Sequence, residues 1–151
     1  MALFIDTNVF IDALHGKNTR GEHARELIKK ALSNEYGAVY TSDYVLVEYV
    51  SAAVGQSRDR DRKTKQDALE KIREGEKLLQ DSAITLLHVD EETIGQAKVC
   101  FNKYSDYGLT LTDWTCAVLM RKNRIDRVMT FDAGFERLKS TKEYDGIERM
   151  C

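Results

Sequence analysis

The sequence has few cysteines, no long apolar run and almost no net charge, and each absence excludes a class of protein. Its three cysteines, Cys100, Cys116 and Cys151, are far apart and odd in number, and none forms a C-x-x-C pair. We therefore expect neither a disulfide framework nor a zinc site. No apolar run approaches the roughly 20 residues that span a bilayer, and the first residues, MALFID, do not resemble a signal peptide. These features predict a cytoplasmic protein without a membrane anchor.

The small net charge of −2 gives no global positive field that would attract nucleic acid. Any affinity for nucleic acid must come from a local basic patch or from metal ions that bridge to phosphates. Of the 151 residues, 42% are hydrophobic and 32% are charged, which is typical of a soluble globular protein with a substantial core. We expect one domain over residues 1–151.

Short apolar segments alternate with helical patterns along the chain. The apolar segments predict strands at residues 2–6, 37–41, 83–89 and 126–131. Helical spacing predicts helices at residues 8–16, 21–33, 43–54, 90–104 and 111–123. The 43–54 segment is apolar nearly all round, which predicts a buried helix. Residues 55–82 are polar and charged, and they predict an exposed loop that leads into a solvent-facing helix.

This alternation predicts an α/β fold of three layers, with a central parallel sheet of four to five strands between helices. Right-handed crossovers place the carboxyl ends of all strands along one edge, where open α/β sheets bind their ligands. Asp6 ends the first predicted strand, and Asp132 follows the 126–131 strand. If both strands lie near the middle of the sheet, both side chains emerge at this edge.

Four acidic residues lie in surroundings that otherwise predict burial. Most of the 25 Asp and Glu residues are mixed with Lys and Arg in solvated segments. The exceptions, each within an apolar segment, are Asp6, Glu48, Asp113 and Asp132. A buried, unpaired carboxylate costs several kcal/mol or takes up a proton, and four on one edge would also repel one another. One or two Mg²⁺ or Mn²⁺ ions would remove both penalties, because these hard cations prefer carboxylate oxygens.

Each of the four residues also has an explanation that needs no metal. Asp6 and Asp132 could cap the helical segments that follow them, and Asp113 could interact with the dipole at the start of its helix. Glu48 could lie on an outward stripe of its helix. A further lone acid, Asp12, is interpreted as solvated. One shared cause explains the four positions better than independent coincidences do.

Four segments resemble, in order and spacing, the PIN-domain nucleases, and most of all the VapC-type ribonuclease toxins of toxin–antitoxin pairs. The segments are FIDTNVFIDAL, TSDYVLVEYVSAAV, GLTLTDWTCAVLM and DRVMTFDAGFERL, and the resemblance extends from about Leu3 to Leu138. It implies a metal-dependent endoribonuclease that uses one or two Mg²⁺ or Mn²⁺ ions. The implied partners are an RNA substrate, an antitoxin protein and a second copy of the chain in a homodimer.

The resemblance also implies a role for each residue of the acidic quartet, all four of which would surround the metal. Asp6 and Asp113 would bind it directly, and Asp132 would complete a second or water-mediated shell. Glu48 would orient or deprotonate the attacking water. The polar residues that would support these acids are Thr7, Asn8 and Thr110.

Two departures from the family pattern concern the surroundings of the quartet. Trp114 follows the third acid, where the family usually has a small residue, and this bears on the shape of the groove. The charged segment Ser57–Asp81 matches no family motif. The best basic patches for RNA are Ser57–Lys65 and Arg121–Arg127. A solvated face is the preferred interpretation of the first, because Asp59 and Asp61 dilute its charge, whereas the second could equally be either. From the second patch we predict substrate contacts by Arg121, Lys122 and Arg124.

Other functions stay open at this point. The chain could be a non-catalytic PIN-like module that binds RNA or protein, or a PIN nuclease that acts in RNA processing. The intact quartet argues against the first, because a non-catalytic domain has no reason to keep repelling acids. A phosphatase with an aspartyl nucleophile is a further alternative, but such sites usually carry a second Asp where Asn8 stands.

Overall fold

The structure is a computed structural model that describes residues 1–57 and 61–151. Its strands are β1 (Ala2–Ile5), β2 (Ala38–Ser42), β3 (Ile84–Leu87), β4 (Arg127–Met129) and β5 (Glu148–Met150). Its α-helices are α1 (Thr7–His15), α2 (Thr19–Leu32), α3 (Asp43–Ser57), α4 (Arg62–Leu79), α5 (Glu91–Lys103) and α6 (Leu111–Lys122). Two 3₁₀ helices, η1 (Ser105–Tyr107) and η2 (Ala133–Ser140), complete the fold. Within the described ranges, no helix has both the length and the apolar character needed to cross a membrane.

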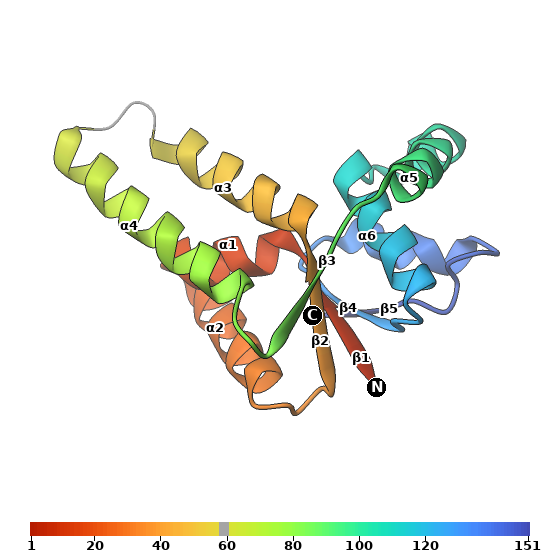
Figure 1. Cartoon of the computed structure of the whole chain (residues 1–151), viewed down its shortest axis with the longest axis horizontal. Coiled ribbons are helices and arrows are strands. Elements are labelled where there is room, and N and C mark those ends of the chain that lie inside the picture. The colour runs from red at the N-terminus through yellow and green to blue at the C-terminus, as the bar shows by residue number, and fades with distance from the viewer. Residues whose placement is uncertain (58–60) are drawn as a thin grey trace.

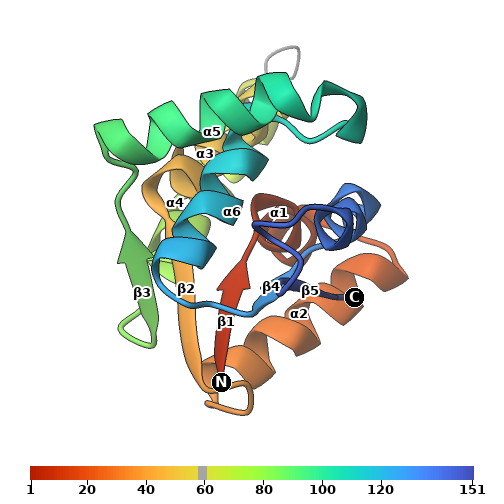
Figure 2. The ribbon, with the colours of Figure 1, turned by 90° about the vertical axis from the view of Figure 1, so that its right-hand side faces the viewer.

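The five strands form a parallel sheet in the order β3-β2-β1-β4-β5, which confirms the predicted fold class. The chain builds β1, β2 and β3 in one direction, with α1 to α4 on one face of the sheet (Figure 1). It then crosses back to β4 and β5, with α5 and α6 on the opposite face (Figure 2). The edge strand β5 was not predicted, because its short sequence ERM carries no apolar run.

The reversal of direction places β1 and β4 side by side at the centre of the sheet. Leu3 pairs with Arg127 and Ile5 with Met129. The pairing continues one residue further, since the Asp6 N–H donates to the Met129 carbonyl at 3.1 Å. Such a switch point is where open α/β sheets bind ligands at their carboxyl edge. The condition set out from the sequence for Asp6 and Asp132 is therefore met.

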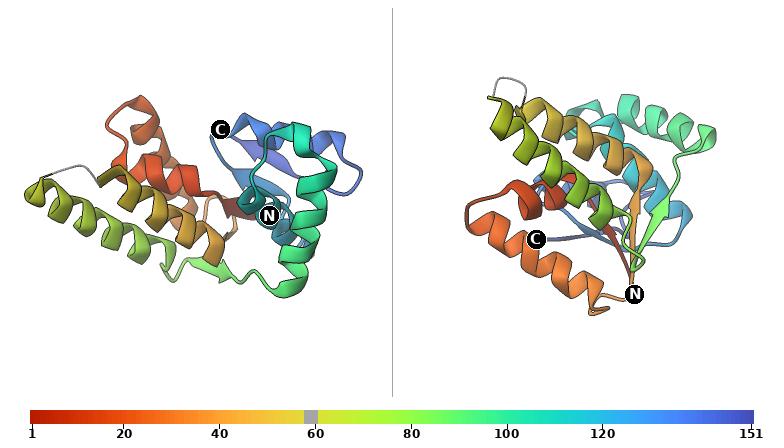
Figure 3. Two further views of the ribbon diagram at one scale, coloured as in Figure 1. Left: turned by 90° about the horizontal axis from the view of Figure 1, so that it is seen from above. Right: turned by 60° about the vertical axis from the view of Figure 1, so that its left-hand side comes forward.

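Two predictions about α3 and the charged segment need correction. The 43–54 helix is not buried all round, because Val47 is 63% exposed. It runs on to Ser57, and α4 lies alongside it, so that the pair projects from the sheet (Figure 3). One side of α4 is buried through Ile72 and Leu79, whereas the rest faces solvent as expected. The predicted loop between the helices falls mainly on residues 58–60, which lie outside the described residues.

Candidate active site

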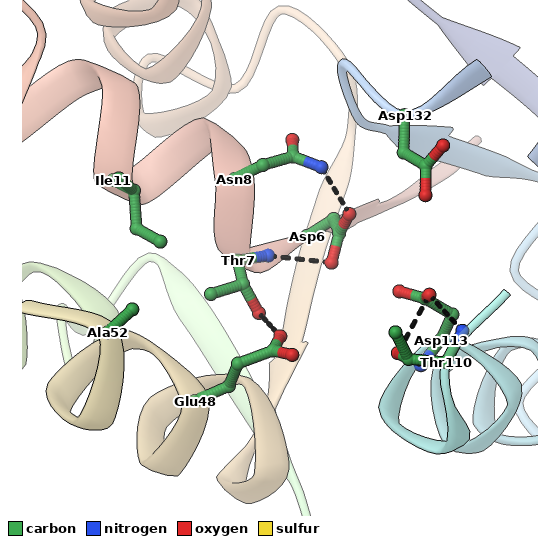
Figure 4. A pocket seen from close by; sticks show the side chains of 9 residues that line it. All are labelled: Asp6, Thr7, Asn8, Ile11, Glu48, Ala52, Thr110, Asp113 and Asp132. Carbon is green, nitrogen blue, oxygen red and sulfur yellow. Dashed lines mark hydrogen bonds between the residues drawn. The ribbon is translucent and has the colours of Figure 1, made fainter. Parts of the chain in front are cut away.

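The four acidic residues singled out in the sequence line one pocket at the carboxyl edge of the sheet (Figure 4). The pocket has a volume of about 280 Å³. It is built from the start of α1, the middle of α3, the first turn of α6 and the segment after β4. Its lining residues are Asp6, Thr7, Asn8, Ile11, Glu48, Ala52, Thr110, Asp113 and Asp132. The fold thus brings together side chains that are far apart in the sequence, since Asp6 and Asp132 are 126 positions apart.

Asp6 is the most buried acid of the pocket, at 2% exposure. It caps α1, with its Oδ1 accepting the Thr7 N–H at 2.7 Å. Its Oδ2 accepts the Asn8 amide at 2.8 Å and the Thr130 hydroxyl at 2.7 Å. Burial raises the pKa of Asp6 from 3.8 to about 7, with a further contribution from the negative charge of Asp113, because the hydrogen bonds only partly offset desolvation.

Asp113 lies in the first turn of α6, where it forms a capping box with Thr110. Its Oδ2 accepts both the Thr110 N–H, at 2.6 Å, and the Thr110 hydroxyl, at 2.8 Å. Burial raises the pKa of Asp113 from 3.8 to about 6, although the Thr110 hydrogen bonds act in the opposite direction. Glu48 and Asp132 add to the rise through their negative charge. The four acids therefore interact electrostatically as one group.

Glu48 and Asp132 complete the group from α3 and from the segment after β4. Glu48 accepts a hydrogen bond from the Thr7 hydroxyl, so it faces the pocket and not an outward stripe. Asp132 caps η2 by accepting the Gly134 N–H at its Oδ1, at 2.7 Å. Asp6 and Asp132 do cap the helical segments that follow them, and Asp113 does lie in the first turn of its helix, as the alternative explanations supposed. They do not compete with the pocket, because each acid uses some of its acceptor positions for the cap and keeps others for the cavity.

The pattern of residues in this pocket agrees with a comparison against protein families. A family model for the PIN domain matches residues 3–140. The chain belongs to the PIN-domain family. The sequence matches no curated protein significantly.

Solved structures share the PIN fold of this chain at low sequence identity. One is the sarcin-ricin loop cleaving toxin VapC20 of Mycobacterium tuberculosis, with a TM-score of 0.66 at 20% identity over 86% of this chain and 89% of that chain. A second is VapBC2 of Rickettsia felis bound to a promoter DNA fragment, with a TM-score of 0.64 at 14% identity over 100% of both chains. A third is FitAcB of Neisseria gonorrhoeae, with a TM-score of 0.64 at 16% identity over 99% of this chain and 96% of that chain.

Within this PIN domain, the structure also shows a polar residue that the sequence analysis did not identify. Thr130 follows β4 directly, is fully buried and donates to Asp6. A signal for it was present, because side chains alternate along a strand and Thr130 lies two positions before Asp132. The apolar residues Ile11 and Ala52, which line one side of the pocket, were likewise not identified. Neither differs from its apolar neighbours in sequence.

One interpretation made from the sequence is wrong, and the structure also answers the question that Trp114 raised. Asp12 is not solvated: it is 9% exposed and forms a two-point ion pair with Arg20, at 2.9 and 3.1 Å. Trp114 does not shape the groove. Its ring is fully buried and stacks on Tyr104 at 5.3 Å between centroids, and it does not line the pocket. The core beneath α6 accommodates the large Trp114 ring at a position where the family usually has a small residue.

The structure does not bring the predicted substrate-binding cations to the pocket. Lys122 lies nine residues after Asp113, which corresponds to about 13 Å along the helix axis, and it is paired with Asp90 and Glu92 of the α5 region. Arg121 lies over the Tyr144 ring. Arg124 comes after the end of α6 and does not line the pocket.

The other basic patch, Ser57–Lys65, is described only in part. It includes residues 58–60, which lie outside the described residues. Its Asp61 caps α4. The patch therefore stands as predicted from the sequence, without a position relative to the pocket.

The donor set of this PIN pocket suits a hydrated magnesium or manganese ion better than a fully protein-coordinated one. Four carboxylates face one cavity, and burial and mutual repulsion raise the pKa of Asp6 and Asp113. A bound cation would offset both the burial of the negative charges and their repulsion. Among the described residues, no three His, Cys, Asp or Glu side chains converge into a complete metal site. Mg²⁺ usually takes one or two carboxylates and keeps several waters. The lining of the pocket therefore has the carboxylate chemistry that such an ion prefers.

Proposed function

We propose that this chain is a metal-dependent endoribonuclease that hydrolyses RNA phosphodiester bonds and acts in the cytoplasm as the toxin of a VapBC-type pair. The observation that carries the proposal is the convergence of Asp6, Glu48, Asp113 and Asp132 on one pocket of a PIN fold. Holding four acids together without a cation costs free energy, as the raised pKa values of Asp6 and Asp113 indicate. A protein that uses a divalent cation recovers this cost.

Asp6 and Asp113 are the proposed direct ligands of Mg²⁺ or Mn²⁺, because they are the two most buried acids of the pocket. Asp132 keeps one oxygen free of its cap and would act through water. A bound ion would neutralise the scissile phosphate and make a nearby water more acidic. Whether one or two ions bind is left to metal titration.

Glu48 is the proposed base, because it is the acid of the pocket that is neither buried nor used as a helix cap. The Thr7 hydroxyl holds Glu48 at Oε2, which leaves Oε1 to accept a proton from the attacking water. Thr110 holds Asp113 in the same way. Both amide hydrogens of Asn8 are used by Asp6 and Thr130, and its oxygen accepts the Phe131 N–H. An amide also has no proton to exchange, so Asn8 cannot replace the second acid of an aspartyl phosphatase.

An antitoxin partner and a homodimer belong to the same proposal. The structures of similar fold from Rickettsia felis and Neisseria gonorrhoeae are of VapBC2 and FitAcB, and the first is a complex bound to promoter DNA. Light scattering on the purified protein tests the homodimer, and a monomer at all concentrations would contradict it.

The nuclease proposal is tested with a pool of structured RNAs, in Mg²⁺ or Mn²⁺ and in chelator. We expect cleavage by the wild type only with metal, and Asp6→Asn should reduce it by about a hundredfold or more. The matched control is Asp126→Asn, which removes one exposed acid at the start of β4.

Three outcomes would contradict the proposal or redirect it. Retained Mn²⁺-dependent cleavage by Asp6→Asn, after contaminating nuclease is excluded, refutes the assignment of the site. Cleavage that persists in chelator refutes the metal dependence. RNA binding by a wild type that never cuts would favour the non-catalytic module.

A further inference from the structure

We infer that Thr130 is a positioning residue that leaves Oδ1 as the single oxygen of Asp6 available to a divalent cation. This inference rests on the proposed metal-dependent function. Thr130 follows β4 directly and is fully buried. Its hydroxyl donates to Asp6 Oδ2 at 2.7 Å and accepts from the Asn8 amide at 2.9 Å and from the Asp132 N–H at 3.0 Å. A hydroxyl has one donor and two acceptor positions, so all three are used.

The Asn8 side chain is fixed by the same network. Its amide nitrogen has two hydrogens, and these go to Asp6 Oδ2 and to the Thr130 hydroxyl. Its carbonyl oxygen accepts the Phe131 N–H at 2.9 Å. A reversed amide would place its oxygen against the Asp6 carboxylate and its nitrogen against a backbone N–H. The orientation of Asn8 is therefore set by its neighbours, and Asn8 cannot turn away to free Asp6.

The two oxygens of Asp6 are consequently unequal. A carboxylate oxygen has about two acceptor positions. Oδ2 fills both, with Asn8 and Thr130 as donors. Among the residues that the structure describes, only the Thr7 N–H donates to Oδ1, at 2.7 Å, so Oδ1 keeps one position open. Asp6 can therefore bind a cation through Oδ1 while its other oxygen stays within the network.

Thr130 also fixes Asp6 relative to a second acid of the pocket. Because its hydroxyl accepts the Asp132 N–H while it donates to Asp6, one oxygen atom connects the ends of β1 and β4. Loss of this hydroxyl would leave a hydrogen of Asn8 and the Asp132 N–H without an acceptor, and would free one lone pair on Oδ2. Asp6 could then rotate, and the spacing between the two acids would no longer be determined.

Mn²⁺ affinity measured by calorimetry on Thr130→Val, Thr130→Cys and Thr130→Ser tests this role without relying on activity. Valine keeps the shape of threonine without the hydroxyl, cysteine has a weak S–H donor, and serine restores the O–H. The matched control is Thr41→Val, since Thr41 is also a fully buried threonine of the sheet but donates only to the Ile5 carbonyl.

We expect Thr130→Val to weaken Mn²⁺ binding by about tenfold or more, Thr130→Cys to weaken it less, and Thr130→Ser and Thr41→Val to stay close to wild type. Affinity unchanged in Thr130→Val overturns the inference. If that variant does not fold, unchanged affinity in Thr130→Cys overturns it equally. A crystal structure with Mn²⁺ bound to both oxygens of Asp6 would also overturn it.

These outcomes separate this inference from the proposed function. A wild-type protein that binds no Mn²⁺ or Mg²⁺ refutes both. A wild type that binds the ion and cuts RNA, together with a Thr130→Val variant of equal affinity, refutes only the role of Thr130. A loss of folding stability in Thr130→Val with full Mn²⁺ affinity would assign Thr130 to the structure alone.

Discussion

Replacing Asp113 with asparagine should stabilise the metal-free protein, although it removes a residue of the proposed active site. The Asp113 Oδ2 accepts both hydrogen bonds from Thr110, at 2.6 and 2.8 Å. The carbonyl oxygen of an asparagine can accept the same two bonds, so the capping box of α6 is kept. The new NH₂ group then faces the pocket, where Asp6, Glu48 and Asp132 supply acceptors (Figure 4).

The magnitude follows from the raised pKa of Asp113. Its folded value of about 6, against 3.8 for the unfolded chain, corresponds to roughly 3 kcal/mol at about 1.36 kcal/mol for each pKa unit. Because the folded pKa is the higher one, the folded state binds more protons between these values. The free energy of unfolding therefore falls as pH rises through this range. The full cost of roughly 3 kcal/mol applies at about pH 8, and only about half a kcal/mol applies at about pH 4.

Urea unfolding in EDTA at these two pH values measures the effect. We expect Asp113→Asn to be more stable than wild type by up to roughly 3 kcal/mol at the higher pH, with little difference at the lower pH. With saturating Mg²⁺ or Mn²⁺ the wild type should become the more stable of the two. A metal ion that binds only the folded state stabilises it, and the variant lacks one of the carboxylates that would bind the ion. The exposed Asp126→Asn serves as the control and should change little.

Two results would refute this reasoning. One is a variant that is less stable than wild type in EDTA at about pH 8, which would show that the carboxylate of Asp113 stabilises the fold without metal. The other is a difference in stability that does not depend on pH. That result would show that Asp113 is not protonated in the folded protein in this range, and that burial does not raise its pKa.

Three further predictions follow from other contacts. Gly75→Ala should destabilise the protein by about 1–3 kcal/mol, because a Cβ there would overlap the Tyr49 ring. The control Gly55→Ala should not destabilise it, because a Cβ there meets nothing within 4 Å. Equal chemical denaturation midpoints for the two variants would contradict this prediction. Thr110→Ala should lower the free energy of unfolding by about 1 kcal/mol, measured by thermal unfolding, because it removes the N-cap of α6. Thr110→Ser, which keeps a hydroxyl at the N-cap, should have the stability of the wild type. Because the pKa of Asp6 is about 7 without metal, Mg²⁺ affinity measured by calorimetry should level off above about pH 7 and fall about tenfold from pH 7 to pH 6. Below about pH 6 it should fall more steeply, because Asp113 also takes up a proton there. A flat profile would contradict the assignment of Asp6 as a ligand.

Local sequence was sufficient to place Asp6, Glu48 and Asp113 at the correct strand end or in the correct helix. The apolar segment before Asp6 ends in a residue that caps the next helix, and the Thr110–Asp113 pair has the spacing of a capping box. Both signals depend only on near neighbours in the chain. Glu48 could be identified because it is the only ionisable residue of an apolar stretch, although helical period alone could not tell which way it faced.

Two features could be predicted from the sequence alone: the alternation of strands and helices, and the acids that do not suit their apolar surroundings. Both are local properties, since burial patterns repeat every two or 3.6 residues. Only the tertiary structure decided that β1 and β4 are neighbours, and hence that Thr130 holds Asp6. It also decided that Asp12 pairs with Arg20, that Trp114 is buried away from the pocket, and that Lys122 pairs with Asp90. These facts depend on how separate elements pack, and no short window of sequence contains that information.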